Sequence, residues 1–108
     1  MHNLTFRILA ALRDGPADGQ VILERLRETS EERRDPSLPT LYRWLRASLE
    51  DTWIEVAETR GDATPGRPPQ TYRLTAAGVE ALEAEARRHR DLAALVLGAG
   101  TTGKPGGN

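Results

Sequence analysis

Side chains that can bind a polyanion gather between residues 37 and 50. Arg43 and Arg46 lie three positions apart, so they would share one face of a helix. A guanidinium is a planar fork of donors that fits two phosphate oxygens, or O6 and N7 of guanine. Thr40 and Tyr42 add hydroxyl groups that can reach a base or a phosphate. This combination is typical of a surface that binds nucleic acid.

The segment that carries these side chains is predicted to be a helix from Ser37 to about Glu50. Its leucines fall on one stripe, the pattern of a helix with one buried face. These are Leu38, Leu41, Leu45 and Leu49. Ser37 suits the N-cap, and Pro39 falls in the first turn, where its missing N–H removes no helical hydrogen bond. Ser37 and the free N–H groups of that turn could also hold a phosphate.

Two shorter helices are predicted ahead of this one. The first covers about residues 3–13, with Asn3 as its N-cap, and ends at an Asp-Gly-Pro sequence because proline cannot continue the helix. The second covers about 18–29 and opens at Asp18 or Gly19. A charged connector without apolar residues follows over 30–36 and belongs on the surface.

A β-hairpin and a long helix are predicted after the arginine-bearing helix. The strands cover about 53–57 and 71–74, where apolar and polar residues alternate. The loop between them, 60–69, is broken by two glycines and three prolines. Thr75 then suits an N-cap for a helix that runs from Ala76 to about Leu97.

Three helices followed by a hairpin is the element order of a winged helix-turn-helix. The expected fold class is therefore mainly α with a small β-hairpin wing (α+β), extended by a long C-terminal helix. We expect a DNA-binding domain over 1–75, a dimerisation helix over 76–97 and a disordered, glycine-rich tail over 98–108.

In this fold the second helix of the pair enters the major groove, and here that is the 37–50 helix. Arginines at the hairpin tip could enter the minor groove, and Arg73 could brace the phosphates beside it. The full set of predicted DNA contacts is Ser37, Thr40, Tyr42, Arg43, Arg46, Arg60, Arg67 and Arg73. Arg43 could read a base or only a phosphate.

Two other interpretations of this face stay open. Arginines on a solvated helix commonly serve solubility, and Tyr42 taken alone is more often a packing residue. The net charge of −1 does not favour a polyanion partner, although residues 33–73 hold seven arginines against six acids. Acids next to the helix favour a rival function, a winged helix that binds proteins instead of DNA. They are Glu50, Asp51, Glu55 and Glu58.

Three motifs, in order, resemble the PadR-like transcriptional regulators over about residues 4–85. The opening 8–22 is similar to that family's leucine-rich helix followed by Gly-Pro. Pro39-Thr40-Leu41-Tyr42-Arg43-Trp44-Leu45 is similar to its recognition-helix signature, and 72–78 to its strand-to-helix junction. The resemblance implies a dimeric repressor whose C-terminal helix supplies the dimer contact. With twofold symmetry the recognition helices would lie roughly 34 Å apart, on successive major grooves, which predicts an inverted-repeat operator.

The chain departs from the family pattern at two places. The family usually carries a glycine between the recognition helix and the first wing strand, whereas this chain has Asp51-Thr52-Trp53. We therefore expect a differently shaped helix end. Trp44 stands where a small residue is common, so it could line a pocket at the dimer interface or simply pack.

A long apolar stripe on the last helix favours a homodimer, although the helix could instead fold back onto its own domain. The expected dimer residues are Leu4, Ile8, Val79, Leu82, Ala86, His89, Ala93 and Val96. A small-molecule effector is a further candidate partner, with a pocket lined by Trp44, Trp53 and His89.

Other functions find little support in the sequence. The chain has no cysteine and two histidines, His2 and His89, so neither a catalytic centre, a cofactor nor a metal is expected. Residues 61–68 have the glycine spacing of a phosphate loop but lack its lysine and hydroxyl residue. The longest near-apolar run, 92–100, is about half of the ~20 residues that span a bilayer. With no signal peptide visible, we expect a cytoplasmic protein without membrane contact.

Overall fold

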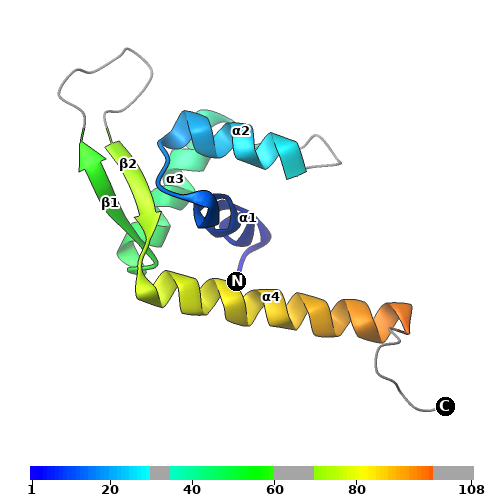
Figure 1. Ribbon diagram of the computed structural model, residues 1–108. Helices are drawn as coiled ribbons and strands as arrows, with labels where there is room; N and C mark the ends of the chain where they lie inside the picture. The colour runs from blue at the N-terminus through cyan, green and yellow to red at the C-terminus, as the bar shows by residue number, and fades with distance from the viewer. Residues whose placement is uncertain (30–34, 60–69, 99–108) are drawn as a thin grey trace.

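The computed structural model describes residues 1–29, 35–59 and 70–98 (Figure 1). It is mostly helical, with one antiparallel two-stranded sheet, which confirms the expected fold class. The elements in chain order are α1 Asn3–Ala11, a 3-10 turn over Leu12–Asp14, α2 Gly19–Thr29, α3 Leu38–Glu50, β1 Ile54–Thr59, β2 Gln70–Leu74 and α4 Ala76–Leu97. The predictions for Arg60, Arg67, the 60–69 loop and the tail from 99 onward concern residues outside the described ranges, where most of the 30–36 connector also lies.

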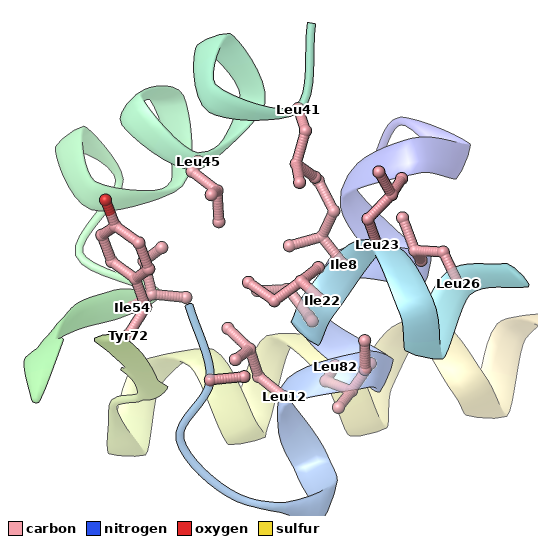
Figure 2. Close-up of a cluster of buried hydrophobic side chains, with 13 residues drawn as sticks. Ile8, Leu12, Ile22, Leu23, Leu26, Leu41, Leu45, Ile54, Tyr72 and Leu82 are labelled. Carbon is pink, nitrogen blue, oxygen red and sulfur yellow. The ribbon is translucent and has the colours of Figure 1, made fainter. Parts of the chain in front are cut away.

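One hydrophobic core joins the three short helices to the hairpin (Figure 2). The leucine stripe predicted on α3 turns inward, and Leu41 and Leu45 are fully buried. They meet Ile8 of α1 and Ile22 of α2 from the other side, while Ile54 closes the core at the hairpin. Burial of this apolar surface fixes the orientation of α3, because its opposite face must then point to solvent.

The hairpin is joined to the helices by an isolated antiparallel β-bridge between Ala17 and Tyr72. The amide of Ala17 donates to the carbonyl of Tyr72 at 3.0 Å, and the amide of Tyr72 donates back at 2.9 Å. Within the hairpin, Glu55 lies opposite Arg73, and the register shifts between Val56 and Glu58. The bridge at Ala17, ahead of α2, has no apolar alternation and was not predicted.

Four side chains cap the helices. Asp18 accepts the amide of Val21 at 2.9 Å at the start of α2, which resolves the choice between Asp18 and Gly19. Ser37 and Thr75 cap α3 and α4 as predicted. The prediction of Asn3 for α1 is wrong, because Asn3 is already helical and the ring of His2 accepts the amide of Leu4 at 3.0 Å.

The end of α3 has an unusual backbone conformation. Thr52 has a φ of 61°, in the left-handed region that glycine favours. Its amide donates to the carbonyl of Leu49 and that of Trp53 to the carbonyl of Ser48, both at 3.0 Å. This is the Schellman pattern, with threonine in the position that commonly holds glycine. Despite the departure at 51–53, α3 thus ends in a left-handed conformation that suits glycine better than threonine.

The start of α4 is fastened to the base of the hairpin. The Thr75 hydroxyl donates to the carbonyl of Thr52 at 2.6 Å, and the Thr75 amide donates to the carbonyl of Trp53 at 3.0 Å. Gly78 lies so close to Trp53 that a Cβ at residue 78 would overlap the Trp53 carbonyl oxygen. The hairpin and α4 therefore meet backbone to backbone.

The long helix α4 packs on α1 with its first half and continues beyond it (Figure 1). Leu82 is buried against the core. Leu92, Leu95, Val96 and Leu97, in contrast, are 55%, 78%, 79% and 80% exposed. Within the described residues, no helix combines the length and hydrophobicity needed to cross a bilayer.

Candidate nucleic-acid interface

The outward face of α3 carries two guanidinium groups. Arg43 and Arg46 are both exposed, opposite the buried leucines. Neither forms an ion pair with another residue in the described parts of the chain. Both can therefore bind an anion without first breaking an ion pair to another described residue.

The predicted contacts at the start of α3 are already hydrogen-bonded to each other. The Ser37 hydroxyl accepts the amide of Thr40 at 3.3 Å and donates to its hydroxyl oxygen at 3.1 Å. This pair uses the Thr40 amide, and Pro39 has no N–H, so the Leu38 amide is the one that the first three residues of α3 leave for an anion at the positive end of the helix dipole.

Tyr42 points toward α2 and is only partly exposed. Its hydroxyl end lies directly over Gly19, where any side chain at residue 19 would meet it. The ring thus braces α3 against the first turn of α2. This placement agrees with the packing role left open for Tyr42.

A polar corner lies where α3 faces β2. Tyr72 is buried, and its hydroxyl points toward α3 (Figure 2), where it donates to Oε1 of Gln70 at 3.3 Å. Burial raises the pKa of Tyr72, and the nearby charge of Arg46 offsets part of that rise. Gln70 was not predicted as a site residue; the available signal was that residues 70 and 72 share one face of a strand.

Arg73 lies on the other face of the hairpin. Its Nε donates to a carboxylate oxygen of Glu55 at 2.7 Å, and both side chains are about half exposed. A phosphate would have to compete with this carboxylate for the guanidinium. Arg73 is therefore less available to DNA than Arg43 or Arg46.

Asp35, which sequence reasoning missed, joins the helices just ahead of α3. One carboxylate oxygen lies 3.8 Å from a guanidinium nitrogen of Arg7 in α1, and the other lies 3.6 Å from Nε of Arg27 in α2. Arg7 also donates to the carbonyl of Leu26 at 3.2 Å. These contacts fix the start of α3 relative to both preceding helices.

The residues expected at a dimer interface divide into two groups. Ile8 has no exposed surface and Leu82 has little, so both pack within the protomer, with Leu4 and Val79 half-buried. The exposed members are Ala86, His89, Ala93 and Val96. An apolar hollow of about 330 Å³ opens between α1 and α4, lined by Phe6, Ala10, Arg13, Leu82, Glu83 and Ala86.

The three residues expected to line an effector pocket have different neighbours. Trp44 stacks on His2 with ring centres 4.3 Å apart, His89 stacks on Phe6 at 4.5 Å, and Trp53 lies at the turn from α3 into β1. His89 also contacts Glu85 at 3.1 Å. The first two stacks place N-terminal residues against α3 and α4.

Glu85 is a nearly buried carboxylate on α4. Burial alone would raise its pKa, but the hydrogen bond with His89 and the charges of the N-terminal ammonium and Arg88 together hold that pKa below its usual value. The ammonium of Met1 lies 3.9 Å away. No group of three or more potential metal ligands occurs among the residues that the structure describes.

Comparison with known proteins identifies the family. The profile of the transcriptional regulator PadR-like family matches residues 8–84. No curated protein matches the chain well enough to be counted as a relative. A PadR family transcription regulator from Clostridium difficile R20291 is similar in structure, with a TM-score of 0.73, 22% identity, and coverage of 87% of this chain and 94% of that one.

Two further solved structures are similar. A PadR-like transcription factor from Bacteroides fragilis has a TM-score of 0.70 and 25% identity, with 89% of this chain and 88% of that chain covered. Bacillus subtilis PadR in complex with operator DNA has a TM-score of 0.66 and 22% identity, with 79% of this chain covered but 47% of that chain. With a helical domain, a hairpin beside α3 and a family match over most of its length, the chain belongs to the PadR-like family of transcriptional regulators, not to a family of enzymes.

Proposed function

We propose that this protein binds a specific DNA sequence as a homodimer and represses transcription there. The observation that carries the proposal is the pair Arg43 and Arg46, exposed on α3 and outside any ion pair with the described residues. Their fork geometry suits guanine edges and phosphates. The operator complex of the B. subtilis relative supports a DNA partner for this chain.

The second copy is proposed from the exposed part of α4. Leu92, Leu95 and Val96 leave a large apolar surface in water, which monomeric proteins rarely tolerate in one patch. The apolar hollow between α1 and α4 lies on the same helix and offers a complementary surface in the partner. Two copies related by a twofold axis would bury both surfaces and present two α3 helices to successive major grooves, about 34 Å apart.

An inverted-repeat operator follows from that symmetry. Fragmented genomic DNA captured by the purified protein and then sequenced should be enriched in one palindromic site. Expression from a promoter that carries this site should fall when the protein is present, which separates a repressor from an activator. Because the protein would act on chromosomal DNA, we also propose a cytoplasmic location.

The rival function, a protein-binding winged helix, is tested on the same samples. If the protein makes about six phosphate contacts, the logarithm of its affinity for duplex DNA should fall with the logarithm of salt concentration with a slope of roughly −5. Arg43→Ala should weaken binding and lower that slope by about one per bound subunit. Arg87→Ala, an exposed arginine of α4, is the matched control. If Arg43→Ala and Arg87→Ala bind duplex DNA equally well, the outward face of α3 is not the DNA-binding surface.

An effector site is a further proposal: a ligand in the same hollow between α1 and α4 would compete there with the partner subunit. Its walls are almost entirely apolar, with Arg13 and Glu83 at 3.3 Å from each other as the polar pair. A ligand there would be mainly apolar. Thermal shift across a panel of such compounds, followed by DNA release, is the appropriate test.

A further inference from the structure

In the corner between α3 and β2, Tyr72 and Gln70 form a hydrogen bond that has no part in the DNA contacts proposed so far. The Tyr72 hydroxyl donates to Oε1 of Gln70 at 3.3 Å. Tyr72 is 5% exposed, so its ring is held by the core and its hydroxyl has a fixed position. Gln70, at the first position of β2, is only partly buried.

In the structure this hydrogen bond occupies the carbonyl end of the Gln70 amide. A free glutamine offers both a carbonyl acceptor and an NH2 donor, and its two ends can exchange by rotation. With the carbonyl oxygen accepting from Tyr72, the NH2 group is the end left to face a ligand. The charge of Arg46 acts on the same hydroxyl from α3. The corner therefore presents a cation and a neutral donor, which together suit a ligand that only accepts hydrogen bonds.

The position of the corner indicates which acceptor that is. In a helix-turn-helix the N-terminal residues of the recognition helix contact base edges. Arg46 directly follows Leu45 in the second half of α3, the part of the helix toward which the Tyr72 hydroxyl points (Figure 2). Side chains there are directed toward the wall of the groove, and that wall is the phosphate backbone.

We propose that Arg46 and Gln70 together bind one backbone phosphate, and that Tyr72 is the positioning residue that turns the Gln70 amide donor toward it. The inference rests on the proposed DNA-binding function and adds two residues to it. A phosphate oxygen accepts from the guanidinium and from the amide NH2, so the Gln70 contact is independent of base sequence. It can therefore be measured on any duplex.

The test compares four single variants and one double variant with the wild type on a duplex of arbitrary sequence at low salt. Gln70→Met keeps the length of the side chain and removes the donor, and binding should weaken about tenfold, as for one hydrogen bond to a charged group. The salt slope should not change, because no charge is lost. Arg46→Ala should weaken binding and also lower the slope by about one per bound subunit. Thr71→Val, on the other face of β2, is the matched control and should bind like the wild type.

The double variant Gln70→Met with Tyr72→Phe tests the positioning role of Tyr72. Tyr72→Phe keeps the buried ring and frees the Gln70 amide to rotate, so binding should weaken several-fold in the wild-type background and not at all in Gln70→Met. A purely structural role of Tyr72 would instead weaken both backgrounds equally. Thermal unfolding of each variant shows whether the fold is retained.

The outcomes are distinguishable. If Gln70→Met and Tyr72→Phe bind as tightly as the wild type while Arg43→Ala does not, the phosphate corner is refuted and DNA binding stands. If the losses of DNA affinity caused by Gln70→Met and Tyr72→Phe add up in the double variant, the positioning role of Tyr72 is refuted. If the wild type binds no duplex at any salt concentration, the proposed function itself fails.

Discussion

Replacing Thr52 by glycine should make this protein more stable. Thr52 has a φ of 61°, where an L-residue with a Cβ is strained by roughly 1–2 kcal/mol, and β-branching adds to the crowding. Glycine adopts this conformation freely, although its greater freedom in the unfolded chain costs about 0.5–1 kcal/mol. The net expectation is a gain of about 1 kcal/mol in the free energy of unfolding. For a domain of this size that corresponds to a rise of roughly 4–8 °C in Tm.

The measurement is thermal and urea unfolding at one fixed protein concentration, because dimerisation would stabilise the folded state by mass action. Thr52→Ala is the matched control. It removes the hydroxyl but keeps the Cβ, so it should retain the strain and gain little. The backbone bonds from Thr52 and Trp53 to Leu49 and Ser48 are present in all three proteins and should cancel. A glycine variant no more stable than the alanine variant would refute the argument from left-handed strain.

Three further variants test other contacts. Gly78→Ala should lower the free energy of unfolding by about 3 kcal/mol, because the new methyl would overlap the carbonyl oxygen of Trp53. The same change at an exposed helical glycine would raise it by about 1 kcal/mol, so the sign of the change in urea unfolding decides between the two. Leu95→Lys with Val96→Lys should weaken the proposed dimer at least tenfold without unfolding the protomer, as measured by analytical ultracentrifugation; an unchanged dimer would place the interface elsewhere. The pKa of Glu85 is lowered in the folded state, so its charge stabilises the fold above the ordinary carboxyl pKa, and this contribution is lost as pH falls through the folded pKa. Glu85→Gln should therefore be less stable at pH 7 and approach the wild type near the acid limit, and parallel curves from pH 7 to 3 would contradict this.

The sequence predicted the features that repeat or that occupy a fixed place at a helix end. The leucine stripe of α3 predicted its buried face, and Ser37 and Thr75 predicted where α3 and α4 begin. The family usually carries a glycine after this helix, and in this chain Thr52 takes a left-handed conformation there. Hydrogen bonds from Thr75 and Trp53 determine that turn, so the identity of residue 52 alone could not indicate it.

The site was less predictable than the fold, because its chemistry depends on contacts between distant residues. Asp35 is one carboxylate in a charged stretch until the fold brings Arg7 and Arg27 to it. Gln70 is an ordinary strand residue until Tyr72 fixes its amide. The sequence does not distinguish Arg73 from Arg43 as a DNA contact. Arg73 is less available to DNA because Glu55 lies opposite it in the hairpin. Pairing of this kind has no periodicity, and therefore leaves no pattern along the chain.

The same pairing explains how a chain with a net charge of −1 could bind a polyanion. Acids and arginines neutralise each other at several places away from the outward face of α3, as in the pairs Arg73–Glu55 and Arg13–Glu83. Arg43 and Arg46 are outside such pairs among the described residues. Within a Debye length of about 8–10 Å, a bound phosphate would sense these two cations more strongly than the charge of the whole chain. A small net charge also keeps nonspecific affinity low, so base contacts from α3 would account for a larger share of the total affinity for an operator.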